Sequence, residues 1–143
     1  MYFISTELGH LVLSLVAGYI CYKSYKRWSS WFWAVLSGFL VDLDHLFDYF
    51  LLRGWQFNLP DFISSRYYHE ANRVYILLHS WELVLLLGVV SIFSKKKHVF
   101  CPLALGLALH LIWDHLTNPA YWYTYTLIGR YVQDFMLTRL FAY

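Results

Sequence analysis

The sequence has little charge for its length. Charged residues make up only 14% of the 143 residues, against roughly 25% in ordinary soluble domains. Apolar residues make up 59%, which is too many to hide inside so small a globule, because its surface stays large relative to its volume. The composition therefore argues against an ordinary soluble domain and favours a lipid environment.

Other absences narrow the function classes. The two cysteines, Cys21 and Cys101, form no CxxC pair, which argues against a redox pair or cysteine metal ligands. The net charge is only +2 and no basic tract is long, so we expect no nucleic-acid partner. The opening MYFISTELGH lacks the basic segment of a secretory signal, so we expect the first apolar stretch to stay in the membrane.

Four apolar stretches have the length needed to cross a hydrocarbon core about 30 Å thick. They cover residues 5–25, 31–52, 74–93 and 99–116. The connections YKSYKRWSS and SKKKH are short and basic, so the positive-inside rule predicts that both are cytoplasmic. We predict an all-α polytopic membrane protein, a bundle of about four transmembrane helices, with residues 1–119 as its metal-site domain.

The C-terminal segment has a different pattern. Pro119 ends the fourth stretch, because proline cannot continue the helical hydrogen bonds. Residues 120–143 mix Arg130, Asp134 and Arg139 with apolar side chains, which predicts an amphipathic helix in the membrane interface. A fifth membrane crossing is the alternative.

Histidines and carboxylates lie inside these apolar stretches, and no lysine or arginine of the stretches lies at comparable depth. Each acidic residue at the bilayer centre costs about 2.5–3.5 kcal/mol. A bound cation offsets this cost best, since imidazole nitrogen and carboxylate oxygen are ligands for zinc, manganese or iron. We therefore predict that the metal ligands are His10, Asp42, His45, His79, His110 and Asp114.

Depth and spacing support this set. With a rise of 1.5 Å per residue, the six side chains lie about 8 to 15 Å beneath the outer ends of their helices. Asp42 and His45 are three residues apart, and His110 and Asp114 are four apart, so each pair shares a helix face. Six ligands are too many for one four-coordinate zinc and indicate two ions.

Two further carboxylates are candidates for the catalytic base. Asp44 or Glu82 is expected to orient the attacking water. Asp44 also shares a helix face with Asp48, so the two are candidates for orienting ligands from outside the metal sphere.

These motifs, taken in order, resemble those of a known family. The segments Thr6–His10, Val41–His45, His79–Ser80 and Gly106–His115 resemble bacterial membrane-bound metal-dependent hydrolases, the YdjM-like inner-membrane proteins. The resemblance extends to about Pro119 and implies a hydrolase in the cytoplasmic membrane of a bacterium. The order of the motifs is also similar to zinc-dependent phospholipase C, which points towards phosphoesters.

The leading hypothesis is a metal-dependent hydrolase that uses zinc or manganese. A site so deep cannot easily meet a soluble polymer, so we expect the partner to be membrane lipid, with a lipid-like ester or phosphoester entering from the outer leaflet. The aromatic loop at residues 53–73 is a candidate lid over an extracytoplasmic site.

Two other classes fit less well. A proton or divalent-metal transporter would also use intramembrane Asp and His residues, but the inner halves of the stretches are apolar. A haem-binding electron carrier would need histidines but no carboxylates.

Overall fold

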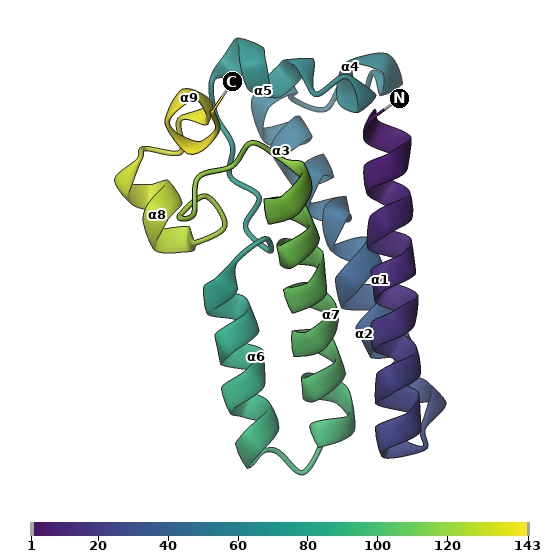
Figure 1. Ribbon diagram of the computed structural model, residues 1–143. Helices are drawn as coiled ribbons and strands as arrows, with labels where there is room; N and C mark the ends of the chain where they lie inside the picture. The colour runs from purple at the N-terminus through teal and green to yellow at the C-terminus, as the bar shows by residue number, and fades with distance from the viewer. Residues whose placement is uncertain (1, 143) are drawn as a thin grey trace.

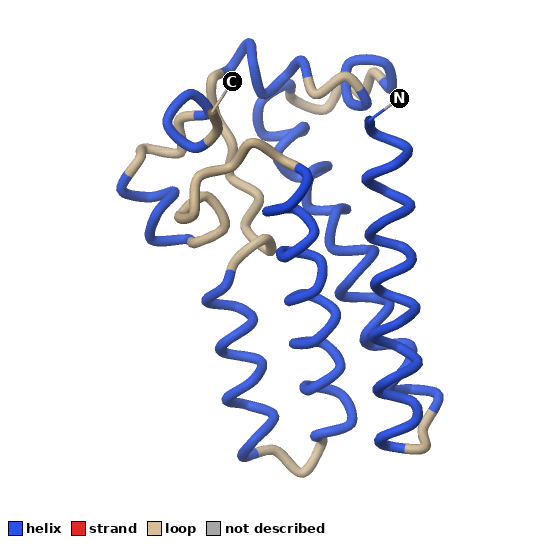
Figure 2. Tube along the Cα trace, viewed as in Figure 1, coloured by secondary structure: helices blue, strands red, loops and turns tan. Residues whose placement is uncertain are grey.

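The structure is a computed structural model that describes residues 2–142, with the side chains of residues 6–142. All its regular elements within this range are helical (Figure 2). Four long segments form a bundle (Figure 1), in which α7 packs against α1, α2 and α6. They are α1 (Tyr2–Tyr25), α2 (Trp28–Phe39) with its continuation, α6 (Trp81–Phe93) and α7 (Lys97–Thr117).

Small residues let the helices of the bundle approach closely. A Cβ atom added at Gly106 on α7 would lie 2.2 Å from the carbonyl oxygen of Ala34 on α2. One added at Gly38 would lie 2.6 Å from Oγ of Ser14 on α1. Close contact through Gly, Ala and Ser is typical of helices that associate within a membrane, where van der Waals packing replaces the hydrophobic driving force.

The second apolar stretch is helical but broken. After α2 the chain tightens into the 3₁₀ turn η1 (Leu40–Leu43) and then resumes as α3 (Asp44–Arg53). The sequence predicts one helix over residues 31–52, so the break is new. It lies at Asp42 and Asp44, and a 3₁₀ stretch within a helix often marks a functional site.

The third helix is shorter than the sequence predicts. We expect a span over residues 74–93, whereas α6 begins at Trp81 and residues 74–80 are irregular. The reason is that carboxylates satisfy the amide groups of this segment. Asp48 accepts hydrogen bonds from the amides of Tyr75 and Ile76, and Asp44 accepts one from the amide of Leu78.

Short helices cover one end of the bundle. α4 (Leu59–Ile63) and α5 (Arg66–Ala71) cross above α3, at the end opposite the two basic loops (Figure 1). Arg53 pairs with Asp61 at 3.0 Å and with Glu70 at 2.7 Å, and so holds both helices near α3. The aromatic loop therefore lies at the position expected of a lid.

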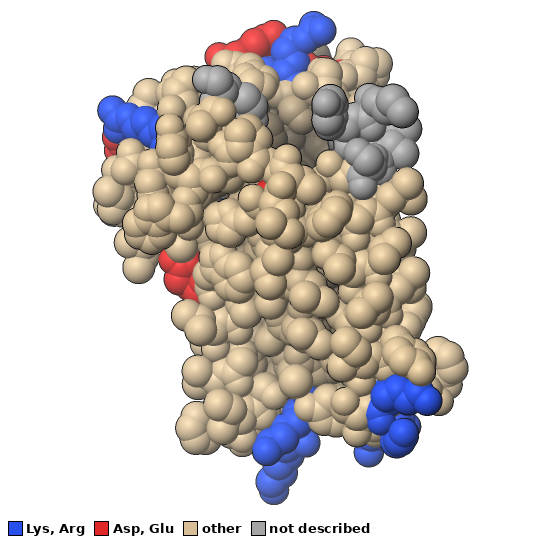
Figure 3. All heavy atoms as spheres, viewed as in Figure 1, with Lys and Arg blue, Asp and Glu red and all other residues tan. Residues whose placement is uncertain are grey.

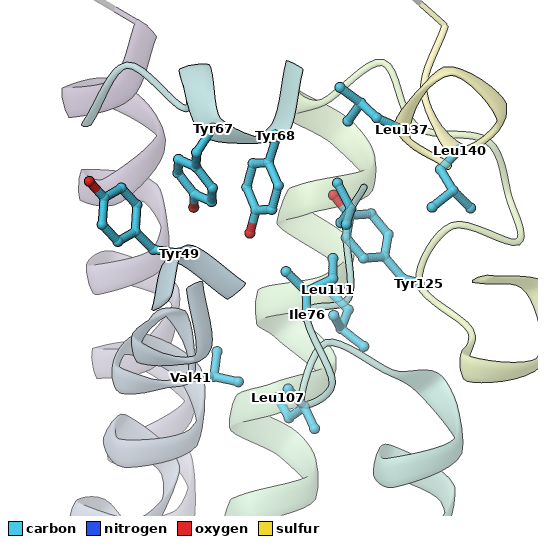
Figure 4. Packing of buried hydrophobic residues seen from close by; sticks show 11 residues of the cluster. Val41, Tyr49, Tyr67, Tyr68, Ile76, Leu107, Leu111, Tyr125, Leu137 and Leu140 are labelled. Atoms are coloured by element: carbon cyan, nitrogen blue, oxygen red, sulfur yellow. The ribbon is translucent and has the colours of Figure 1, made fainter. Parts of the chain in front are cut away.

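The C-terminal segment differs from the predicted amphipathic helix. It folds into turns, α8 (Leu127–Val132) and α9 (Leu137–Leu140). A continuous helix is interrupted because Asp134 and Phe135 adopt positive φ angles of 54° and 56°. The segment also contributes to the core, since Tyr125, Leu137 and Leu140 belong to the same buried cluster as residues of α3, α5 and α7 (Figure 4).

The outer surface of the bundle is largely apolar. Leu85 and Ile92 on α6 are 68% and 65% exposed, and Val12 on α1 is 56% exposed. On the face shown in Figure 3 the charged residues gather mainly at the two ends of the molecule, with a largely uncharged belt between them. Among the described residues one helix, α7, is long and apolar enough by itself to cross a membrane, and α6 is a shorter apolar helix.

Candidate metal centre

The structure brings the six predicted ligands together near one end of the bundle. His10 comes from α1, Asp42 from η1, His45 from α3, His79 from the segment before α6, and His110 and Asp114 from α7. They form three overlapping groups in which the ligand atoms of each group lie within 4.8 Å of one another. These groups are His10–Asp42–His110, Asp42–His45–His79 and His79–His110–Asp114.

Asp42 lies at the centre of the cluster. Its Oδ1 atom is 3.2 Å from Nε2 of His79, 3.4 Å from Nε2 of His110 and 3.5 Å from Nε2 of His45. In a tetrahedral zinc site with bonds of 2.0–2.1 Å, neighbouring ligand atoms lie about 3.3 Å apart. The separations therefore match those of ligands around one small cation.

Asp114 completes the cluster from α7. Its Oδ2 atom lies 3.4 Å from Nε2 of His110, and its Oδ1 atom lies 3.3 Å from Nε2 of His10. The rings of His10 and His110 stack with their centroids 3.9 Å apart. Within the described residues His10, His79, His110 and Asp114 are all buried.

The outward nitrogens of three histidines have defined partners. Nδ1 of His110 donates to the carbonyl oxygen of Gly38 at 3.0 Å. Nδ1 of His79 lies 3.1 Å from both carboxylate oxygens of Asp44. Nδ1 of His45 lies 2.7 Å from the hydroxyl of Tyr68, and burial raises the pKa of that hydroxyl, which keeps it protonated. Such outer partners orient histidines that bind metals.

These partners determine which nitrogen holds the lone pair. A carbonyl or carboxylate oxygen accepts hydrogen bonds, so the Nδ1 atoms of His79 and His110 are protonated and their neutral rings carry a lone pair on Nε2. The two Nε2 atoms lie 3.0 Å apart, beside the oxygens of Asp42 and Asp114. A shared proton or a metal ion can occupy the space between these donors, and a divalent metal suits this set of nitrogen and oxygen ligands.

Asp44 and Asp48 hold the segment that carries His79. Both are buried, and their carboxylates bind its amides as described above. Asp44 therefore orients His79 from outside the ligand cluster, which is one of the two roles expected for it. The catalytic role expected of Asp44 is not supported, because its oxygens face the Nδ1 atom and not the inner Nε2 atom.

Glu82 requires a correction. We expect it to be a catalytic base, but its carboxylate accepts hydrogen bonds from the amides of Leu127 at 3.0 Å and Ile128 at 3.2 Å. These amides lie in the first turn of α8, whose free N–H groups need acceptors. Glu82 belongs to none of the three metal-capable groups, so its role here is to join α6 to the C-terminal segment.

Arg130 is the buried cation that sequence reasoning missed. Its side chain is fully buried, and its Nη1 atom donates to the carbonyl oxygens of His79 at 2.7 Å and Thr124 at 3.1 Å. Burial lowers the pKa of Arg130, while the negative charges of Asp44, Glu82 and Asp48 oppose that shift. Arg130 comes from outside the four apolar stretches, and it reaches the vicinity of these carboxylates because the C-terminal segment folds inward.

A cavity of about 790 Å³ opens beside the cluster. His10, Asp42, His45 and Asp114 line it together with Glu7. The remaining walls are mostly apolar and include Phe39, Leu40, Leu43, Leu46, Phe62 and Trp113. The cluster therefore has access to a space that suits a ligand with apolar parts.

Some parts of the site carry no signal in the sequence. Tyr68 lies 23 residues from His45, and the Gly38 carbonyl lies 72 residues from His110, so no helical spacing connects them. Sequence spacing alone therefore does not reveal these contacts.

Comparison with known proteins found no match: no protein-family model, curated protein or solved structure matches the chain.

Proposed function

We propose that this protein is a membrane-embedded, metal-dependent hydrolase that cleaves an ester or phosphoester of a lipid-like substrate. One observation carries the proposal: the Nε2 atoms of buried histidines and carboxylate oxygens converge at the wall of a largely apolar cavity. A divalent metal held there supplies Lewis acidity and lowers the pKa of bound water. Zinc and manganese both accept this set of nitrogen and oxygen ligands.

The ligand set suggests room for two ions. Asp42 belongs to one group with His10 and His110 and to another with His45 and His79. Two ions held by these groups would stabilise the attacking and leaving oxygens during hydrolysis. Asp44, with the amide of Leu78, holds His79 so that its Nε2 atom faces inward.

The environment of the bundle supports a membrane location. Soluble monomers rarely expose large contiguous apolar patches, whereas α1 and α6 present exposed leucine, valine and isoleucine along the belt of Figure 3. The two basic loops lie at one end of the bundle and the metal-capable groups near the other (Figure 1). With the basic loops in the cytoplasm, the site faces the extracytoplasmic leaflet.

The resemblance to YdjM-like proteins points to the same activity. Six residues of its motif segments belong to the metal-capable groups: His10, Asp42, His45, His79, His110 and Asp114. We therefore propose membership of the membrane-bound metal-dependent hydrolases and assign the protein to the inner membrane of a bacterium, as a multi-pass protein.

Elemental analysis of the full chain purified in detergent tests the metal centre. We expect about one or two zinc or manganese ions per chain and loss of most of this metal in Asp42→Asn and His110→Ala. The matched controls are Asp134→Asn and His98→Ala, which change residues outside the metal-capable groups. Wild-type protein that binds neither metal, or an Asp42→Asn variant with full metal content, contradicts the proposal.

Activity is tested separately on total lipid extract. Wild-type protein is incubated with the extract, and mass spectrometry identifies lipid species that disappear together with hydrolysis products that form. We expect this conversion with wild type and Asp134→Asn, and none with Asp42→Asn or after chelation. Zinc flux into proteoliposomes without lipid conversion would favour a transporter instead.

A further inference from the structure

A second, smaller cavity lies on another side of the ligand cluster. Its volume is about 140 Å³, against about 790 Å³ for the large cavity. Four residues line both cavities: His45, Ser65, Asp114 and Asn118. Two of these, His45 and Asp114, belong to the metal-capable groups, so the two cavities meet at the candidate metal centre.

The large cavity suits a hydrocarbon chain. Phe39, Leu46 and Trp113 form part of its wall. Leu40 and Leu43 line it as well, and they are 41% and 58% exposed. The cavity is therefore accessible from outside the protein, so a lipid chain can enter it.

The small cavity suits a compact polar group. Tyr68, Ile76, Tyr125 and Leu137 enclose it from four segments of the chain (Figure 4). Its volume is less than a fifth of that of the large cavity, so it suits a small head group such as phosphate better than a bulky one such as phosphocholine.

The charges of the residues that line the small cavity further restrict the kind of head group that it can bind. His79 and Asp114 line the small cavity, whereas no lysine or arginine does so among the described residues. An anionic head group there would face carboxylates unless a metal ion neutralised them. Because the described wall holds histidines but no lysine or arginine, a bound metal would supply the main positive charge for a phosphate in this cavity.

Building on the proposed function, we propose that the substrate is a phosphate monoester of a long-chain alcohol. The chain occupies the large cavity, the phosphate occupies the small one, and the scissile bond lies between them at the metal centre. The oxygen of a water molecule bonds to phosphorus while the bond from phosphorus to the alcohol oxygen breaks. The alcohol takes up the proton that the water loses, so free alcohol and inorganic phosphate are the products.

Binding of three probes to the full chain in nanodiscs tests the inference. The probes are dodecyl phosphate, dodecylphosphocholine and inorganic phosphate, each titrated calorimetrically into zinc-loaded and metal-free protein. We expect zinc-loaded protein to bind dodecyl phosphate at least about tenfold more tightly than either other probe, and we expect chelation to abolish this preference. Equal affinity for the two dodecyl probes, or a preference that survives chelation, overturns the inference.

A variant pair tests the large cavity. Leu43→Trp narrows the cavity and should weaken dodecyl phosphate binding by about tenfold without changing inorganic phosphate binding. Phe47→Trp is the control, because Phe47 is exposed on the adjoining helix α3 but lines neither cavity. Equal affinities in the two variants would exclude the large cavity as the chain site.

The two proposals fail in different ways. Protein that binds zinc and hydrolyses lipid without preferring dodecyl phosphate contradicts this inference and leaves the proposed function intact. Protein that binds no metal contradicts the proposed function itself.

Discussion

The Nε2 atoms of His79 and His110 lie 3.0 Å apart, although the outward nitrogen of each ring already has a hydrogen-bond acceptor. At this distance the two atoms share either a proton or a metal ion. Protons compete with a metal for these nitrogens. We therefore expect zinc affinity to fall as the pH is lowered, with protons released on binding. Calorimetry in buffers of different ionisation enthalpy measures that release, and pH-independent binding would contradict the geometry.

Removing the acceptor behind His79 should weaken the metal site without abolishing it. Asp44→Asn removes the negative charge beside Nδ1 of His79, and loss of such an outer partner typically reduces metal affinity about 10–100-fold. Competition against a zinc chelator measures the change. Unchanged affinity would mean that Asp44 serves only the backbone of residues 74–80.

Glu82 provides a contrasting prediction. Because its carboxylate caps the first turn of α8, Glu82→Gln should lower the stability by about 1 kcal/mol and leave metal content unchanged. Thermal unfolding in detergent and elemental analysis give the two readouts. Loss of metal from this variant would restore the role that the sequence suggests.

The close contact between α2 and α7 can be tested with two glycines. Gly106→Ala should destabilise the protein by about 1–3 kcal/mol, because the added Cβ would lie 2.2 Å from the Ala34 carbonyl oxygen. Gly88→Ala on α6 is the control, since nothing lies within 4 Å of its added Cβ. The midpoint of thermal unfolding should be clearly lower for Gly106→Ala than for Gly88→Ala. Similar midpoints would argue against the close contact between α2 and α7.

The proposed membrane topology predicts which introduced cysteines a reagent can label from the same side of the membrane. In a background without Cys21 and Cys101, Ser29→Cys and Lys96→Cys should react with a membrane-impermeant maleimide only after cell lysis. Gln56→Cys, in the loop before α4, should react on intact cells. Labelling of all three positions on intact cells would contradict the multi-pass arrangement.

Much of the helical bundle is predictable from hydropathy. The stretches at residues 5–25 and 99–116 correspond closely to α1 and α7. The ends of α6 and the break at η1 are not predictable in this way, because they depend on bonds between distant residues. Asp48 holds amides 27 and 28 residues away, and no local pattern encodes such a contact.

Part of the candidate site, like part of the fold, is predictable from the sequence, and the rest is not. The convergence of the six ligands is predictable, because their similar depths and helical spacing are visible in the sequence. Their outer partners are not visible, since Tyr68, the Gly38 carbonyl and Arg130 reach the site through tertiary folding. Glu82 has the depth and spacing expected of a site residue, but the folded C-terminal segment binds its carboxylate.

The contact between Arg130 and the His79 carbonyl has a consequence for biogenesis. His79 receives this support from a segment made 51 residues later in the chain, so its loop lacks the guanidinium until synthesis has passed α8. Metal loading should accordingly follow translation, and a ribosome-stalled chain ending at residue 119 would carry all six ligands and still retain metal poorly.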